Sequence, residues 1–329
     1  MKIGLVGCGK QSEKYVQSLK AAGVEDFVVT DVDQNIQMAF AEKFNCKTAD
    51  SVEALVSTEG LSAGLVCTPV PAHVTAAMKF VNAGIPFMCE KPLAESEQKA
   101  AELTQAAENA SVSGGVTYTY RYVPAFERLK QELENEQCAI GNPITAVFRI
   151  GGRGNHRVWK HMRPDGGVVT EMFCHMLDLA LWLFGDFESL TIKDQKQLHQ
   201  ERTIGGETVS VDAEDFVYIE GMTKSGIHCA FVSDFITPSF SQYLEVQGDN
   251  GAFFGSIQPF FQSRFLLNSP VRDLEKGMHD IETSGPGVID RIALELIDVA
   301  EGNGKFRCTL HDANLTQRHL QHVISQLSF

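Results

Sequence analysis

The sequence predicts two domains: an α/β domain with a parallel sheet, then an α+β domain with a large, open and mostly antiparallel sheet. The length of 329 residues exceeds the roughly 100–200 residues of one typical domain. Short β-rich runs alternate with helical patterns up to about residue 120, and longer strands joined by tight turns follow. We place the boundary so that the domains span residues 1–121 and 122–329.

In the first domain, each β-rich run is followed by a helical pattern after a short loop. This alternation is typical of a parallel sheet with helices on both faces. The expected strands span residues 2–6, 26–30, 64–68, 85–89 and 113–119. The expected helices span residues 11–22, 34–44, 51–58, 72–83 and 95–110.

The pattern changes after Val123-Pro124, where longer β-rich runs begin. Residues 223–226 and 248–251 have the composition of hairpin turns, so the strands on either side should pair antiparallel. A long apolar helix is expected from about Val168 to Gly185, because glycine commonly follows a helix end. The other expected elements are a helix at 125–134 and strands at 144–150, 190–196, 216–222, 227–235, 243–247 and 252–257.

The composition is that of a soluble protein, with 43% apolar residues and no run of about 20 apolar residues that could cross a membrane. Met1-Lys2 leads directly into Ile3-Gly4 without the apolar region of a signal peptide, so we expect a cytoplasmic protein. The eight cysteines form no CxxC pair, which predicts reduced thiols. The net charge of −14 argues against nucleic acids and anionic membranes as partners.

A glycine-rich turn, Gly7-Cys8-Gly9-Lys10-Gln11-Ser12, follows the first expected strand and opens the first helix. Gly7 permits a tight turn, Gly9 lets the backbone approach a pyrophosphate, and the helix N-terminus offers free N–H groups. Ser12 stands where such turns usually carry a third glycine. The strand–turn–helix setting favours a dinucleotide site over an ordinary connection.

Asp31 ends the second expected strand and lies 24 residues after Gly7, close to the spacing of an acid that binds ribose hydroxyls. A carboxylate there accepts hydrogen bonds from the hydroxyls and repels a 2′-phosphate. Since no arginine follows closely, the sequence favours NAD(H) over NADP(H). Asp33 is the alternative for this role, with a loop carboxylate as its other interpretation.

The strand expected at 85–89 ends in Glu90-Lys91-Pro92. A lysine that leaves the carboxyl end of a parallel strand points into the crevice where such sheets bind ligands. Pro92 restricts the backbone just beyond it, and its peptide bond is a candidate for the cis form. The alternative is a solvated loop lysine.

These motifs together resemble the Gfo/Idh/MocA oxidoreductases: the Gly-x-Gly turn, Cys67-Thr68-Pro69, Ala83-Gly84, Glu90-Lys91-Pro92-Leu93, and Tyr120-Arg121-Tyr122-Val123-Pro124 at the domain junction. The resemblance covers essentially the whole chain and implies a Rossmann nucleotide domain. It places Thr68 and Pro69 against the ribose and nicotinamide, and Glu90 and Lys91 beside the nicotinamide. The residues expected at the cofactor are Gly7, Gly9, Lys10, Gln11, Asp31, Thr68, Pro69, His73, Glu90, Lys91 and Arg121.

The apolar helix of the second domain carries Glu171, His175, Asp178 and Trp182 at positions i, i+4, i+7 and i+11. At 100° per residue these side chains form one narrow stripe. Buried charges are costly unless they are paired or used, so the stripe favours a functional site. The alternatives are an internal hydrogen-bond network and a metal site of His and carboxylates; we assign no metal.

This stripe resembles the family's Gly-Gly-Gly…Asp-x-x-x-His-x-x-Asp segment, whose histidine is the usual catalytic residue. The resemblance implies oxidation of a secondary alcohol of a sugar, cyclitol or sugar derivative, with hydride transfer to the nicotinamide. His175 would act as the base, Lys91 would hold the substrate oxygen, and Asp178 would support them. Glu171 would orient the substrate or the imidazole; it replaces the family's aspartate, which leaves the substrate class open.

Residues 149–163 are unusually basic for this acidic chain and lead into the same helix. Arg153 can hold an anionic group, and Trp159 can stack on a sugar ring. A flexible loop that balances nearby acids is the alternative. The expected substrate-binding residues are Lys91, Arg153, Trp159, Glu171 and His175.

Two other functions remain open: a non-catalytic NAD-binding regulator on the same fold, and NAD-dependent glycoside cleavage. The presence of both Lys91 and His175 favours the enzyme over the regulator. An open sheet buries its exposed face on another copy, so we expect a homodimer or homotetramer.

Overall fold

The computed structural model describes residues 1–152, 157–163, 166–258 and 260–328. The chain forms two compact units, Met1–Tyr122 with Gly285–Arg318, and Val123–Ser284 with His319–Phe329. The sequence predicts one crossing between domains at residues 121 and 122, whereas the chain later returns to the first unit. It returns because helix α8 (Val288–Ala300) places Ile292 and Leu296 in the core of that unit.

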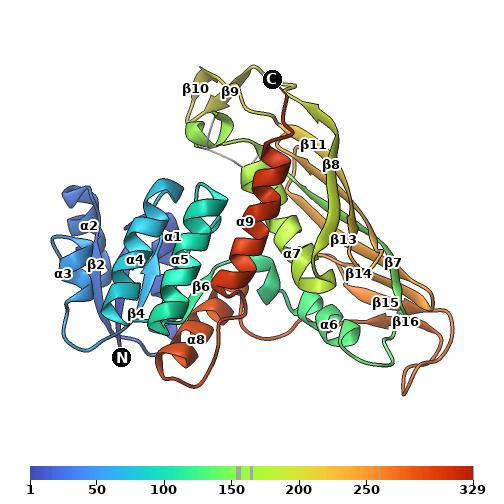
Figure 1. Cartoon of the computed structure of the whole chain (residues 1–329), viewed down its shortest axis with the longest axis horizontal. Helices are drawn as coiled ribbons and strands as arrows, with labels where there is room; N and C mark the ends of the chain where they lie inside the picture. Colours follow the sequence, from blue (N-terminus) through green and yellow to red (C-terminus); the bar gives the residue numbers. More distant parts are fainter. Residues whose placement is uncertain (153–156, 164–165, 259, 329) are drawn as a thin grey trace. The chain divides into compact units, whose positions relative to one another are not determined.

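The first unit contains the predicted parallel sheet, with six strands in the order β3-β2-β1-β4-β5-β6 (Figure 1). All five neighbouring pairs are parallel. The strand order reverses between β1 and β4, which is where open sheets of this kind bind ligands at their carboxyl ends. The strands are β1 (Lys2–Val6), β2 (Asp26–Thr30), β3 (Lys47–Thr48), β4 (Leu61–Val66), β5 (Phe87–Cys89) and β6 (Gly114–Val116).

Helices cover both faces of this sheet, and alternate strand residues enter two separate apolar clusters. Leu5 and Val29 pack with Tyr15 of α1 and Leu296 of α8, whereas Val6 packs on the other face with helices α4 and α5. The helices are α1 (Lys10–Ala21), α2 (Gln34–Phe44), α3 (Val52–Val56), α4 (His73–Ala83), α5 (Glu97–Ala110), α8 and the first part of α9 (Leu310–Ile324), with short turns η1 (Val70–Ala72) and η2 (Thr119–Tyr122).

The second unit contains an eight-stranded sheet in the order β16-β15-β14-β13-β7-β12-β11-β8. Every neighbouring pair is antiparallel except β7 and β12, which confirms a large, mostly antiparallel sheet. The two predicted hairpin turns join β11 to β12 and β13 to β14. The strands are β7 (Pro143–Gly151), β8 (Phe187–Lys196), β11 (Phe216–Thr223), β12 (His228–Asp234), β13 (Ser241–Gly248), β14 (Gly251–Gly255), β15 (Arg264–Leu267) and β16 (Gly277–Asp280).

Strands β15 and β16, and a separate hairpin of β9 (Glu201–Ile204) and β10 (Glu207–Ser210), were not predicted from the sequence. Each has only four residues, which is too short to show a period of two. Helices α8 and α9 were also not predicted, although α8 has a clear apolar face.

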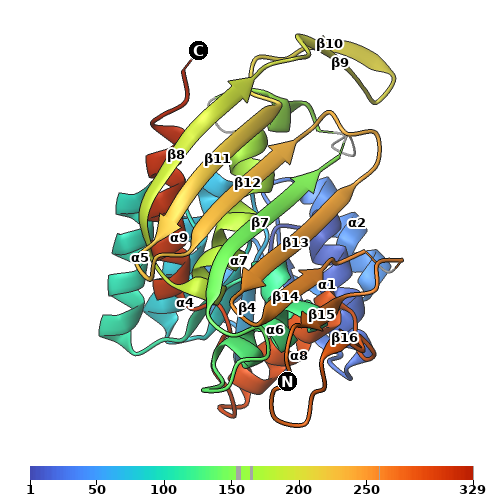
Figure 2. The ribbon, with the colours of Figure 1, turned by 90° about the vertical axis from the view of Figure 1, so that its right-hand side faces the viewer.

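Helices lie behind one face of the large sheet, and Figure 2 shows the other face with its strands toward the viewer. The covering helices are α6 (Pro124–Leu133) and α7 (Cys174–Phe184). Along β7, Ala146 and Phe148 are buried, whereas Thr145 and Val147 are exposed. The sheet is therefore packed on one side.

The long apolar helix begins differently from the prediction. Val169–Phe173 forms a π-helical turn, here called η4, and α7 continues to Phe184, where Gly185 adopts φ +83°. Short π-helical segments inside helices occur frequently at functional sites.

In the described part of the chain, no helix combines the length and the apolar character that a membrane span requires.

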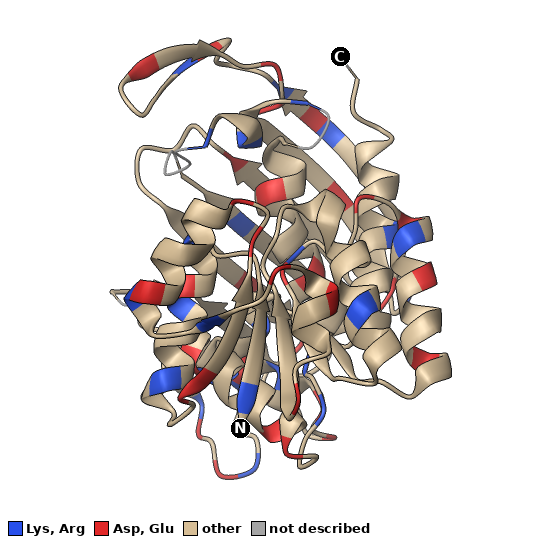
Figure 3. Cartoon of the chain, turned by 90° about the vertical axis from the view of Figure 1, so that its left-hand side faces the viewer, with Lys and Arg blue, Asp and Glu red and all other residues tan. Residues whose placement is uncertain are grey.

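Figure 3 shows one face with Lys and Arg residues in blue and Asp and Glu residues in red. The two kinds are interspersed along the described ribbon on that face. The surplus of acidic over basic residues, 42 against 28, is therefore spread over many elements.

Candidate active site

The glycine turn after β1 has the geometry that a dinucleotide requires. Gly7 adopts φ +94°, and a Cβ there would lie 2.7 Å from the Cys67 carbonyl oxygen, so only glycine fits. Ser12 is buried, and its hydroxyl donates to the Gly7 carbonyl at 2.5 Å. Ser12 thus closes the turn at the position of the third glycine.

Gly9 and the start of α1 leave space and donors for an anion. A Cβ on Gly9 would meet no described atom within 4 Å. Helix α1 begins at Lys10, and no side chain of the described residues caps its first turn. Uncapped N–H groups at a helix N-terminus bind phosphate groups well.

Asp31 contacts the glycine turn directly. Its Oδ2 accepts from the Cys8 N–H at 2.7 Å, and its Oδ1 accepts from the Asp33 N–H at 2.9 Å. Asp33 instead caps α2, because its Oδ1 accepts from the Asn35 N–H at 2.8 Å. The structure therefore gives Asp33 a helix-capping role and leaves Asp31 beside the turn.

The Glu90-Lys91-Pro92 segment at the end of β5 is held from both sides. The buried Tyr15 hydroxyl of α1 donates to Glu90 Oε1 at 2.8 Å, and the Lys91 N–H donates to Glu90 Oε2 at 3.3 Å. Burial and the Glu90 carboxylate raise the pKa of Tyr15. The Lys91–Pro92 peptide bond is cis.

His73 links this segment to the Thr68-Pro69 loop. Its Nδ1 lies 2.9 Å from the Pro92 carbonyl oxygen, and its Nε2 lies 2.8 Å from the Thr68 carbonyl oxygen. Burial lowers the pKa of His73, although the two carbonyls and Glu90 oppose this effect. With both ring nitrogens engaged by backbone, His73 positions the loops that would hold the cofactor.

Thr68 supports the presence of a ligand at this edge of the sheet. Its Oγ1 is buried and has no hydrogen-bond partner among the described residues. A buried hydroxyl without a partner costs about 1–3 kcal/mol, which a ligand contact would offset. Val32, which follows Asp31, is fully exposed and offers an apolar surface for an aromatic base. These residues fit a nicotinamide dinucleotide.

Arg121 is buried against the segment of the chain that returns to the first unit. It is 2% exposed, and its Nη1 donates to the Arg307 carbonyl at 3.0 Å. Arg307 returns a hydrogen bond to the Arg121 carbonyl at 2.9 Å. These contacts tie η2 to the returning segment of the chain, so a cofactor contact of Arg121 stays a prediction.

The second group of predicted residues lies on η4 and α7. Glu171 is buried and Asp178 is completely buried, whereas His175 and Trp182 are partly exposed. Asp178 is therefore placed to support the helix rather than to reach a ligand. His175 is partly exposed and lies one turn after Glu171.

Lys160 contacts the predicted site residue Glu171, and sequence reasoning noted it only as part of the basic segment. Its ammonium group forms an ion pair with Glu171 Oε2 and lies 5.2 Å from the centroid of the Trp159 ring. Lys160 belongs to the short turn η3 (Val158–His161), and its carbonyl accepts from the Gly167 N–H at 2.9 Å. Trp159 is 43% exposed, and Arg153 lies outside the described residues.

Glu214 was missed by sequence reasoning. It is buried, and its Oε1 accepts from the Val169 N–H at 3.0 Å, so it caps the start of η4. Burial raises the pKa of Glu214, although the hydrogen bond from Val169 opposes this. A partner 45 residues away leaves no local signal in the sequence.

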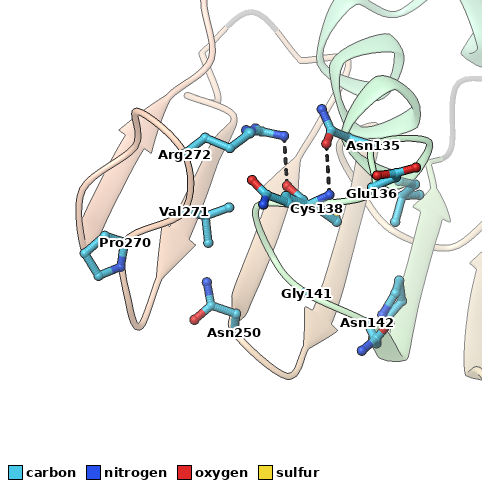
Figure 4. Close-up of a pocket in the computed structure, with 12 residues that line it drawn as sticks. Asn135, Glu136, Cys138, Gly141, Asn142, Asn250, Pro270, Val271 and Arg272 are labelled. Carbon is cyan, nitrogen blue, oxygen red and sulfur yellow. Dashed lines mark hydrogen bonds between the residues drawn. The ribbon is translucent and has the colours of Figure 1, made fainter.

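A separate cavity of about 520 Å³ lies among three loops of the second unit (Figure 4). Arg272 donates to the Gln137 carbonyl at 2.8 Å and pairs with the buried Glu132 at 2.7 Å. The cavity is lined by Leu133, Asn135, Glu136, Gln137, Cys138, Gly141, Asn142, Pro143, Asn250, Pro270, Val271 and Arg272, none of which is a predicted site residue.

Comparison with known proteins places both units in one family. A family model described as the oxidoreductase family with an NAD-binding Rossmann fold matches residues 1–118. A second model, the GFO/IDH/MocA C-terminal domain, matches residues 126–254. A levoglucosan dehydrogenase in complex with NADH and L-sorbose has the same fold, with a TM-score of 0.87 at 17% identity, covering 99% of this chain and 96% of that one.

Curated relatives match this chain over only part of their own length. Glucose-6-phosphate 3-dehydrogenase of Bacillus subtilis is 25% identical over 234 residues, which cover 69% of this chain and 65% of the relative. Inositol 2-dehydrogenase 2 of Saccharopolyspora erythraea is 26% identical over 193 residues, which cover 56% and 54%. The chain thus matches less than two thirds of the length of either relative. On the two family models, the chain belongs to the Gfo/Idh/MocA oxidoreductases, as its motifs predict.

Proposed function

We propose that this chain is an NAD(H)-dependent oxidoreductase that interconverts a secondary alcohol of a sugar, cyclitol or sugar derivative with its ketone. The observation that carries the proposal is that one chain holds both a nucleotide half-site at Gly7, Asp31 and Lys91 and a helix with Glu171 and His175. The names of the relatives, dehydrogenases of glucose 6-phosphate and inositol, support this substrate class.

Residues of the first unit would hold the cofactor. The uncapped N–H groups at Lys10 and Gln11 would bind the pyrophosphate, and the Asp31 carboxylate would accept from the ribose hydroxyls. The negative charge of Asp31 disfavours a 2′-phosphate, which supports NAD over NADP. Thr68 and Pro69 would contact the nicotinamide riboside. When bound, the nicotinamide accepts a hydride from the alcohol carbon or returns it to the ketone.

The chain's own residues would handle the proton and the charge on the substrate oxygen. His175 would accept the hydroxyl proton, since imidazole titrates near neutral pH. The Lys91 ammonium would donate to the same oxygen and stabilise its partial negative charge. Glu171 would orient the substrate or the imidazole. The proposal requires Lys91 and His175 to act on one substrate.

The test is turnover by a panel of polyols, sugar acids, sugar phosphates and nucleotide sugars with NAD⁺, followed by NADH absorbance. Lys91→Met and His175→Asn should each lower kcat by at least about 100-fold, the typical share of one acid–base group. Both variants should still bind NADH by fluorescence titration. Wild-type turnover in either variant contradicts the mechanism. NADH binding without turnover on any probe would favour the regulator.

We also propose a homodimer or homotetramer that buries the outer face of the large sheet. That face carries exposed apolar side chains, among them Val147, Leu266 and Met278. Large exposed apolar patches on a sheet usually meet a partner. Light scattering that shows a monomer at micromolar concentration would contradict this.

All eight cysteines are free, which supports a location in the cytoplasm.

A further inference from the structure

We propose that Lys160 is a positioning residue for this oxidation: it fixes and neutralises the Glu171 carboxylate so that His175, one turn later, stays free of a proton and can accept one from the substrate. The inference rests on the proposed function for its chemical meaning. The effect of Lys160 on the titration of the His175 ring can be measured even if no substrate is turned over.

The first step is the ion pair itself. The Glu171 side chain is 5% exposed, and the Lys160 side chain is 23% exposed, so the carboxylate is the buried member. A buried carboxylate is costly unless a cation or hydrogen bonds compensate it. The Lys160 ammonium supplies that compensation from outside the helix.

The second step is the place of Lys160 in the fold. The turn η3 is attached to the residues just before η4. The Gly167 N–H donates to the Lys160 carbonyl at 2.9 Å, and the Gly166 N–H donates to the Met162 carbonyl at 2.8 Å. A Cβ on Gly166 would lie 2.5 Å from the Trp159 carbonyl oxygen, so the two segments pack closely. The backbone contact holds Lys160 beside η4 independently of its side chain.

The third step links Glu171 to His175. The two residues are four positions apart across η4 and the first residues of α7, so their side chains lie on the same side of the helix. A carboxylate at this spacing stabilises a protonated imidazole when its own charge is not compensated. Lys160 therefore keeps His175 from holding the proton that it must accept from the substrate.

Several other charged groups on the elements packed against this helix have ion-pair partners of their own. Arg149 on β7 pairs with Asp234 on β12, and Lys130 on α6 lies 3.3 Å from Glu134. Further acids near this helix are Asp178 on α7, which is completely buried, Glu127 and Glu132 on α6, and Glu214, which caps Val169. Further bases of residues 157–163 are Arg157, which is exposed, His161, which packs on the Phe235 ring, and Arg163, which donates to the Asp212 carbonyl at 2.8 Å.

The experiment compares the full-length Lys160→Met, Lys160→Arg and Glu171→Gln variants and the Lys160→Met/Glu171→Gln double variant. One readout is the pH profile of kcat/KM for oxidation. The other is NMR titration of the His175 ring, whose signal is assigned by its loss in His175→Asn. Lys193→Met is the matched control, because Lys193 pairs with Glu220 and both side chains are about half exposed.

Lys160→Met should raise the midpoint of His175 titration by about one pH unit and move the acid limb of the profile equally. Glu171→Gln should lower the midpoint, and the double variant should return close to the wild-type value. Lys160→Arg and Lys193→Met should match the wild type. An unchanged midpoint in Lys160→Met and Glu171→Gln, or a shift that persists in the double variant, overturns the proposal. Absence of turnover in the wild type would refute the proposed function, while the NMR titration would still decide the role of Lys160.

Discussion

Replacing Gly7 with alanine should destabilise the first unit by about 2–5 kcal/mol. The backbone at Gly7 has φ +94°, a region that costs a residue with a Cβ roughly 1–2 kcal/mol. The new Cβ would also lie 2.7 Å from the Cys67 carbonyl oxygen, and an overlap of this kind adds about 1–3 kcal/mol. Urea unfolding followed by circular dichroism measures the change.

Gly9→Ala is the matched control for this prediction. Gly9 has φ −81°, and a Cβ there meets no described atom within 4 Å. The free energy of unfolding of the Gly9→Ala variant should therefore stay within about 0.5 kcal/mol of the wild-type value. The same variant should weaken NADH binding, because the methyl group enters the space that the pyrophosphate needs. A Gly7→Ala protein with the unfolding midpoint of the wild type refutes the steric reasoning. So does a Gly9→Ala protein that is destabilised equally.

Three further predictions concern charge and burial. Burial raises the pKa of Glu295 from 4.5 to about 7, so the folded state holds this proton more tightly, and its stabilising contribution is lost as pH rises from about 4.5 to 7. Glu295→Gln should remove this pH dependence, which amounts to up to about 3 kcal/mol in the free energy of unfolding measured with urea. Asp31→Asn should reduce the preference for NADH over NADPH at least several-fold in fluorescence titrations, since the repelling charge is gone. Burial raises the pKa of Cys8 to about 12, so its alkylation by iodoacetamide at pH 8 should require unfolding.

Each of these has a clear contrary result. An unchanged slope in Glu295→Gln would show that the carboxyl titrates equally in the folded and unfolded chain. An unchanged cofactor preference in Asp31→Asn would remove Asp31 from the ribose site. Rapid alkylation of Cys8 in the native protein would show that the thiol is accessible.

Local patterns predicted much of the fold and the strand ends that carry the candidate cofactor residues. The glycine turn, Asp31 and Glu90-Lys91-Pro92 each follow a strand end, so their spacing alone places them at one edge of a parallel sheet. The apolar stretch before Gly185 likewise predicted a helix carrying Glu171 and His175, because helical periodicity is a strong local signal.

Contacts between distant segments were beyond such reasoning. Tyr15 reaches Glu90 across 75 positions, and Glu214 caps Val169 across 45. Neither residue belongs to a motif, and each is defined by packing that only the folded chain creates. The π-helical turn at Val169–Phe173 also escaped prediction, since its side-chain pattern differs little from that of an α-helix over one turn.

The return of the chain to the first unit has a consequence for biosynthesis. Ile292 and Leu296 of α8 share a buried cluster with Leu5, Tyr15 and Val29, which lie more than 250 residues earlier in the chain and emerge from the ribosome first. Domains usually fold as units during synthesis, the N-terminal one first. Here the N-terminal unit lacks part of its core until α8 has been made, so the second unit can complete its eight-stranded sheet first. A nascent chain stalled before residue 285 should therefore expose the apolar surface of α1 to chaperones and proteases.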